Sequence, residues 1–173
     1  MNRNWLFVPA LLVGILALVA VGGATAKKPA LSATPVFKLN LKPSQEVPPI
    51  KGLKASAKGS VTFDLTRNAQ GVIQSGDVIF SFNYSFPGNA TVTGLHIHQG
   101  AKGTNGGIVV PAVLSANDAN DTDGVGNVTS VVAGSAATLQ AILNNPRNYY
   151  VNLHTSANLD GALREQMHNP KAR

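Results

Sequence analysis

The 173-residue chain contains no cysteine, which excludes disulfides and any thiolate ligand or nucleophile. A metal site must therefore use histidine, carboxylate, amide or thioether donors. Glutamate occurs only at Glu46 and Glu165, so paired carboxylates between aromatic sugar platforms are not expected. A GxSxG nucleophile motif is also missing, and no glycine-rich stretch lies between a strand and a helix as a phosphate loop requires. These absences favour a protein that is not an enzyme, without deciding the question.

Basic residues are concentrated near the start of the chain. The net charge is +6, and seven lysines lie between Lys27 and Lys58. No arginine cluster or interleaved aromatic residues accompany them, so nucleic-acid binding is not expected. The lysines are typical of a solvated surface that discourages edge pairing of strands, and attraction to an anionic envelope polymer is the alternative.

The N-terminus has the pattern of a secretory signal peptide. Arg3 precedes an apolar run from Trp5 to Val21, and small residues follow, ending in Ala-Thr-Ala at Ala26. We predict cleavage after Ala26, and hence a secreted or periplasmic protein. The alternative is an uncleaved segment that anchors the chain in a membrane.

The remaining residues suffice for one domain with a substantial core. We expect a disordered linker at 27–35, a domain at 36–168 and a C-terminal tail at 169–173.

Alternating apolar and polar residues predict a mainly β domain. The clearest strand places its aromatic residues on one face, and shorter alternating runs occur throughout the chain. The predicted strands are Val36–Leu41, Gly59–Leu65, 77–86, 93–100, Ile108–Leu114, Asn127–Val132, Tyr149–Thr155 and Gly161–Met167. Pro111 marks its strand as an edge strand or one with a bulge. About eight short strands with one insertion predict an antiparallel sandwich or barrel.

Two local signals complete this prediction. Ser135 can cap a short helix that places Leu139, Ile142 and Leu143 on one side and ends before Pro146. Asp160 and Gly161 are expected to form the turn between the last two strands.

Three of the four histidines are candidates for one site. His96 and His98 are two residues apart in a predicted strand, so both imidazoles point to the same face. His154 lies in a second strand, where it shares a face with Tyr150 and Asn152. If the two strands are neighbours, three imidazoles meet and can hold a metal ion. The alternative is a hydrogen-bonded polar cluster without metal. We expect the fourth histidine, His168, to be solvent-exposed.

An ordered series of motifs resembles the CHRD domain, a module named after chordin that is widespread in bacterial secreted proteins. The motifs are QEVPP at Gln45–Pro49, GxxxFDL ending at Leu65, GLHIHxG at Gly94–Gly100, NGGIVVPAVL at Asn105–Leu114, LxAIL at Leu139–Leu143 and YYVNLHTxxxxDGALRxQ from Tyr149. Near the end, GALREQ stands where the family has GEIRGQ, so that Ala162 replaces the acidic residue and Glu165 replaces a glycine. The resemblance implies an immunoglobulin-like, Greek-key β-sandwich or barrel with one short helix.

The family is also loosely similar to copper,zinc superoxide dismutases. By that analogy His96 and His98 correspond to an HxH copper pair, His154 to a later ligand and Arg164 to the arginine that attracts the anionic substrate. The bridging histidine has no counterpart, because no histidine lies between His98 and His154. A zinc half-site of that kind therefore cannot form.

Three functions follow from these patterns. The first is metal binding by His96, His98 and His154, with copper favoured over zinc by the order of affinities and with Arg164, Asn152 and Glu46 as candidate supporting residues. The second is an extracellular protein-binding or adhesion module whose histidines are structural. The third is a superoxide dismutase-like enzyme. Arg164 is interpreted as a structural partner of a loop rather than a catalytic group.

Overall fold

The computed structural model of the protein describes residues 34–115 and 123–172. The predicted signal peptide and residues 27–33 of the predicted linker lie outside these ranges. Within them, no helix is both long enough and apolar enough to span a bilayer.

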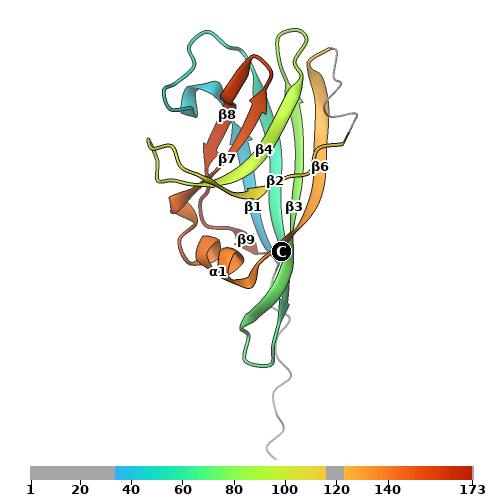
Figure 1. The fold of residues 1–173 in the computed structure, drawn as a ribbon, viewed down its shortest axis with the longest axis vertical. Coiled ribbons are helices and arrows are strands. Elements are labelled where there is room, and N and C mark those ends of the chain that lie inside the picture. The colour runs from blue at the N-terminus through green and yellow to red at the C-terminus, as the bar shows by residue number, and fades with distance from the viewer. Residues whose placement is uncertain (1–33, 116–122, 173) are drawn as a thin grey trace, which may run out of the picture.

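The described chain folds into two antiparallel sheets that face each other (Figure 1). The first sheet has the order β6-β3-β2-β1-β9, formed by Val125–Gly134, Ile73–Ser85, Ser56–Arg67, Pro35–Leu41 and Lys171–Ala172. The second has the order β5-β4-β7-β8, formed by Ile108–Pro111, Val92–Gln99, Tyr149–Thr155 and Asn158–Gln166. The predicted all-β, antiparallel sandwich is confirmed.

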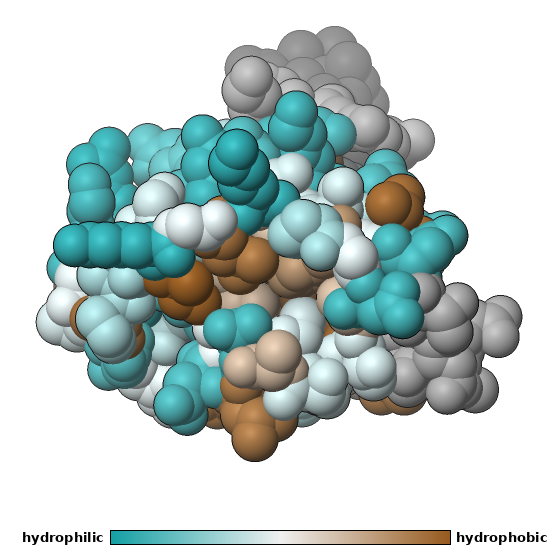
Figure 2. All heavy atoms as spheres, turned by 90° about the horizontal axis from the view of Figure 1, so that it is seen from above, coloured by the Kyte–Doolittle hydropathy of each residue, from teal (hydrophilic) through white to brown (hydrophobic). Residues whose placement is uncertain are grey.

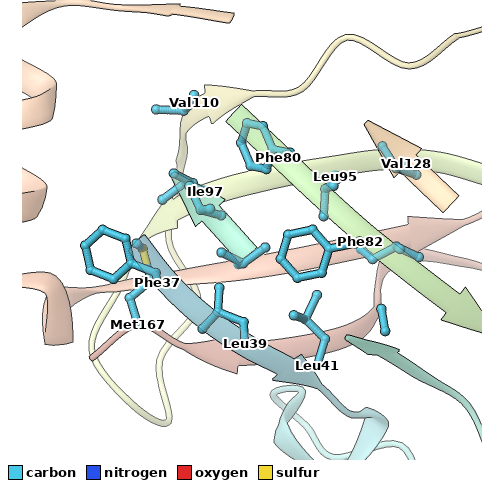
Figure 3. Close-up of a cluster of buried hydrophobic side chains, with 14 of the residues drawn as sticks. Phe37, Leu39, Leu41, Phe80, Phe82, Leu95, Ile97, Val110, Val128 and Met167 are labelled. Carbon is cyan, nitrogen blue, oxygen red and sulfur yellow. The ribbon is translucent and has the colours of Figure 1, made fainter. Parts of the chain in front are cut away.

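Alternation along the strands builds the core between the sheets. Each strand directs every second side chain inward, so the apolar faces of the two sheets meet. Figure 3 shows side chains from both sheets in contact there, among them Phe37, Leu39 and Leu41 of β1, Phe80 and Phe82 of β3, and Leu95 and Ile97 of β4. All of these are nearly or fully buried. At the upper end of the sandwich, the apolar centre is surrounded by hydrophilic side chains (Figure 2).

The predicted short helix is present as α1, Ala136–Asn144. The Ser135 hydroxyl accepts a hydrogen bond from the Thr138 amide at 3.1 Å, which is the expected N-cap. Leu139 and Ile142 are fully buried against the core. The helix is followed by a 3-10 turn, η3, at Pro146–Asn148, and Tyr149 begins β7.

The structure differs from the sequence-based prediction near the C-terminus. The turn between β7 and β8 lies at Ser156–Ala157, and Asp160 and Gly161 are inside β8. Asn158 closes the turn by donating a side-chain hydrogen bond to Thr155 Oγ1. Lys171–Ala172, in the predicted tail, pairs with the start of β1 as β9. His168 is exposed, as expected.

Two loops cover the outer face of the second sheet. The first contains the 3-10 helix η1, Pro43–Gln45, and is joined to β8 by reciprocal backbone hydrogen bonds between Lys42 and Arg164. The second, 100–107, is held at its start by a hydrogen bond from the Gly100 amide to the Asn148 carbonyl. All seven residues of β7 are consequently buried. Polar side chains on this outer face therefore lie in a layer between the sheet and the loops.

Truncation of a core aromatic residue tests this packing. Phe82→Ala should lower the free energy of unfolding by about 3–5 kcal/mol, because the ring is 1% exposed and its removal leaves a cavity. Ser81→Ala, at the adjacent exposed position, should change it by less than about 0.5 kcal/mol. Denaturant unfolding of both variants measures the difference, and equal effects would contradict the described orientation of β3.

Candidate metal centre

The three candidate histidines come from two neighbouring strands. β4 and β7 pair in antiparallel register, with Gly94 opposite His154 and His96 opposite Asn152. His96 and His98 therefore project from the same face of β4, and His154 projects from the corresponding face of β7. The expected adjacency of the two strands is confirmed.

The imidazoles form a compact group. Ring centroids are 4.8 Å apart for His96 and His154, 5.5 Å for His96 and His98, and 5.7 Å for His98 and His154. One nitrogen of each ring lies within 4.8 Å of the corresponding nitrogens of the other two. Metal–nitrogen bonds of about 2 Å require donors roughly 3.3 Å apart, so small rotations of the side chains would bring the group onto one ion.

Backbone carbonyls determine which nitrogen of two rings is free. His98 Nδ1 lies 3.0 Å from the Gly106 carbonyl oxygen, and His154 Nδ1 lies 2.9 Å from the Leu159 carbonyl oxygen. A carbonyl oxygen can only accept a hydrogen bond, so Nδ1 carries the proton in the neutral form of each ring. Nε2 of each ring then has a free lone pair, as a metal ligand must.

The remaining ring nitrogens include three that have no hydrogen-bond partner in the described part of the chain. Nε2 of His98, Nε2 of His154 and Nδ1 of His96 are all buried atoms without a partner. His98 and His154 are only 7% and 8% exposed, whereas His96 is half-buried. Buried polar atoms are nearly always paired in folded proteins, so three rings in one group that each have an unpaired nitrogen could hold a ligand.

Burial also keeps the imidazoles of His96 and His98 in the neutral form that binds metals. Burial, followed by the charges of His154 and His98, lowers the pKa of His96 from 6.5 to about 4. Burial is likewise the main cause that lowers the pKa of His98, although the Gly106 carbonyl opposes the shift. Both rings are therefore neutral at pH 7, and a metal ion does not have to displace protons from them.

Gly94 makes room for the group. A Cβ atom at Gly94 would lie 2.6 Å from Cε1 of His96 and 3.4 Å from Cδ2 of His154. The first distance is shorter than non-bonded carbon atoms tolerate, so a larger residue would displace the His96 ring. The glycine of the GLHIH motif thus positions a candidate ligand.

Arg164 lies on the far side of Tyr150 from the histidines. The Tyr150 ring stacks on His98 at 4.8 Å with an interplanar angle of 9°. The Arg164 guanidinium carbon lies 3.4 Å from the centre of the Tyr150 ring. Because β7 lies between β4 and β8, His98 and Arg164 contact opposite faces of this ring.

The same arginine holds the 100–107 loop in place. Arg164 Nη1 donates to Asn105 Oδ1 at 3.0 Å, and Nη2 donates to the Thr104 carbonyl at 2.8 Å. Its side chain is 1% exposed. These contacts agree with its interpretation as a structural partner of a loop.

Glu46 and Asn152 form a buried polar pair beside this stack. Asn152 Nδ2 donates to Glu46 Oε2 at 3.2 Å, and Glu46 is 5% exposed. Burial raises the pKa of Glu46 to about 7, although the charge of Arg164 and the hydrogen bond from Asn152 lower it. A Cβ atom at Gly161 would lie 2.5 Å from Asn152 Nδ2, and Gly161 has φ of 132°. Gly161 therefore lies within β8, where its lack of a side chain leaves room for Asn152, and the Asp-Gly pair does not form the expected turn.

The structure thus brings together the predicted ligands, with Arg164, Asn152 and Glu46 grouped next to them under the same two loops. Sequence reasoning missed the contributions of Gly94 and Tyr150. Tyr150 shares the alternating face of Asn152 and His154, which is the signal that points to it. The carbonyls of Gly106 and Leu159 leave no signal in the sequence, because every residue has one.

Chemically, the centre offers three neutral nitrogen donors and no charged ligand. It is the one group of three or more histidine, cysteine or acidic side chains within metal-binding distance in the described part of the chain. Imidazole donors fit zinc and copper better than calcium or magnesium, which prefer oxygen. The unpaired buried nitrogens, and the carbonyl contacts that fix the tautomers of His98 and His154, are suited to binding zinc or copper.

The buried carboxyl group of Glu46 should make stability depend on pH. Its folded-state pKa of about 7 exceeds the unfolded value of about 4.5, so its contribution is fully present below pH 4.5 and is lost as the pH rises through 7. Relative to Glu46→Gln, the wild type should lose about 2–3 kcal/mol of unfolding free energy between pH 4.5 and 8. Urea unfolding across this range measures the difference, and parallel curves for the two proteins would contradict the buried carboxyl group.

Comparison with known proteins identifies the family. The sequence model of the CHRD domain matches residues 37–167, which includes every strand of the second sheet and all three histidines. Searches of curated proteins and of solved structures each returned no match. Because the matched region covers most of the sequence, the chain belongs to the CHRD domain family.

Proposed function

We propose that this CHRD domain is a secreted or periplasmic metal-binding protein that holds one ion, preferentially copper, through His96, His98 and His154. The single observation that carries the proposal is the close group of three imidazoles, which offer ligand nitrogens within 4.8 Å of one another and each contain a buried nitrogen without a hydrogen-bond partner among the described residues. The signal-like N-terminal sequence supports export, because it has a basic start, an apolar segment and a small-residue end.

A purely structural role explains these histidines less well. In a structural cluster, both ring nitrogens would be hydrogen-bonded, and an unpaired buried polar atom costs about 1–3 kcal/mol. Here only Nδ1 of His98 and Nδ1 of His154 are paired, and both pairs are with backbone carbonyls. Such carbonyl contacts are the usual support for histidine ligands, because they orient the ring and raise its basicity.

Copper is favoured over zinc by the donor set. The affinity of nitrogen donors for divalent ions rises along the first transition row to copper and falls at zinc. Structural zinc sites are usually closed by four protein ligands, whereas this group has three. A half-buried His96 leaves the centre accessible on its side of the sheet.

Exposed apolar residues favour a second role, as an extracellular protein-binding module. Val113, Val125 and Val131 are 69%, 62% and 59% exposed. Val125 and Val131 lie on the edge strand β6, and the Val113 amide donates to Ser130 Oγ of the same strand. A dismutase-like enzyme is less well supported, because a 1% exposed Arg164 is poorly placed to attract an anion from solvent.

Direct titration tests the metal site. One equivalent of copper should bind the 27–173 chain with micromolar or lower Kd, and His96→Ala/His98→Ala should weaken binding roughly 100-fold or more. His168→Ala removes an exposed histidine and should leave the affinity unchanged. Isothermal titration with Cu(II), Cu(I) and Zn(II) measures all three proteins. Binding that survives in the double variant, or only millimolar binding in the wild type, would refute the proposal.

The packing of Gly94 provides a subtler test. Gly94→Ala should weaken copper binding about tenfold or more, because the added methyl group displaces the His96 ring. Gly107→Ala is the matched control, since a Cβ atom there would meet nothing within 4 Å. Both affinities can be measured by competition with a chromophoric chelator. Equal affinities for the two variants would show that Gly94 does not position a ligand.

A further inference from the structure

The charges around the three histidines affect which ion this group would hold. The three histidines are neutral donors, so the full positive charge of a bound ion remains in the site. His98 and His154 are less than one-tenth exposed, which limits the solvation of that charge by water. A divalent ion is therefore harder to accommodate than a monovalent ion.

Arg164 adds a second positive charge to this region. Its guanidinium stacks on Tyr150, and the opposite face of Tyr150 stacks on His98. The hydrogen bonds of its guanidinium go to uncharged oxygens of Asn105, Thr104 and Ala101. Arginine stays protonated in proteins, so a cation that is 1% exposed lies one aromatic ring away from a candidate ligand.

Glu46 offers little compensation for this charge. Burial raises the pKa of Glu46 to about 7, so much of its population is uncharged at neutral pH. The positive charge of Arg164, one aromatic ring away from His98, therefore opposes added positive charge on an ion bound to that ring.

We propose that Arg164, acting through the stack of Tyr150 on His98, makes the three-histidine centre favour Cu(I) over Cu(II) and Zn(II). This inference rests on the proposed function, since it concerns the ion held by the same ligands. The coordination number supports it, because three donors fall short of the tetragonal arrangement that Cu(II) prefers. Arg164 is a positioning and electrostatic residue in this proposal and does not contact the ion.

The size of the effect of Arg164 depends on the distance between its charge and an ion bound by the three histidines. For charges separated by about 10 Å in a medium with an effective dielectric constant of about 20, one unit charge changes binding of another roughly ten- to twentyfold. Loss of the Arg164 charge should therefore reduce the preference for Cu(I) over Cu(II) about tenfold. A tenfold change corresponds to about 59 mV for a one-electron couple.

The test compares variants that share the structural loss but differ in charge. Arg164→Met and Arg164→Lys both remove the planar fork that binds Asn105 and Thr104, and only Arg164→Lys keeps the charge. Lys102→Met removes an exposed cation from the same loop and is the control for charge in general. Arg164→Gln, which retains an amide donor for the loop, replaces Arg164→Met if that variant does not fold.

The measurement is the ratio of Kd for Cu(II) to Kd for Cu(I), obtained by chelator competition, with Cu(I) handled anaerobically. We expect the wild type to bind Cu(I) more tightly than Cu(II). This ratio should be about tenfold lower in Arg164→Met, and in Arg164→Lys and Lys102→Met it should stay within about threefold of the wild-type ratio. Equal losses in Arg164→Met and Arg164→Lys, or no loss in either, would overturn this inference alone while histidine-dependent binding persisted. A wild type that binds no ion would overturn the proposed function and this inference together.

Discussion

The antiparallel pairing of β4 with β7 is the constraint on which the site depends. It places two histidines of one strand beside a histidine of the next, and it places their apolar neighbours in the core of the sandwich. Because side chains alternate along a strand, a shift of one residue in this pairing would exchange the two faces. The apolar packing of Leu95, Ile97, Val151 and Leu153 therefore also determines where the imidazoles lie.

Two loops cover the outer face of the second sheet and bury the three histidines, His96 only in part. An uncovered sheet would leave the histidines in water, where they would be hydrated and free to protonate. The loop that begins at Lys42 and the loop at 100–107 close over the face, and Arg164 is hydrogen-bonded to the first through its backbone and to the second through its guanidinium. Burial then lowers the pKa of His96 and leaves unpaired nitrogens that would otherwise bind water. One arginine thus contributes to the architecture and to the electrostatics of the same region.

Much of the fold could be predicted from alternation alone, and the rest depends on contacts distant in the sequence. The aromatic face of β3, the cap at Ser135 and the shared face of His96 and His98 are local patterns, and each is present in the structure. The Asp-Gly pair at 160–161 has the composition of a turn. In the structure, Gly161 lies within β8, where the absence of a side chain lets the Glu46 and Asn152 side chains pack against its backbone. That role depends on a loop more than 100 residues earlier in the chain. The tautomers of His98 and His154 likewise depend on carbonyls that only the folded chain brings near.

The unpaired nitrogens cost stability, so the three histidines must lie on elements that other contacts hold firmly. Each unpaired buried atom opposes folding by about 1–3 kcal/mol, so the group can persist only where other contacts stabilise the fold. β4 and β7 are the two interior strands of their sheet, and their inward side chains are fully buried. An ion that satisfies the nitrogens removes this penalty and stabilises the folded state in proportion to its occupancy. Strands that must be ordered for the core to form therefore keep the three candidate ligands in place without an ion, which would lower the entropy lost if an ion bound.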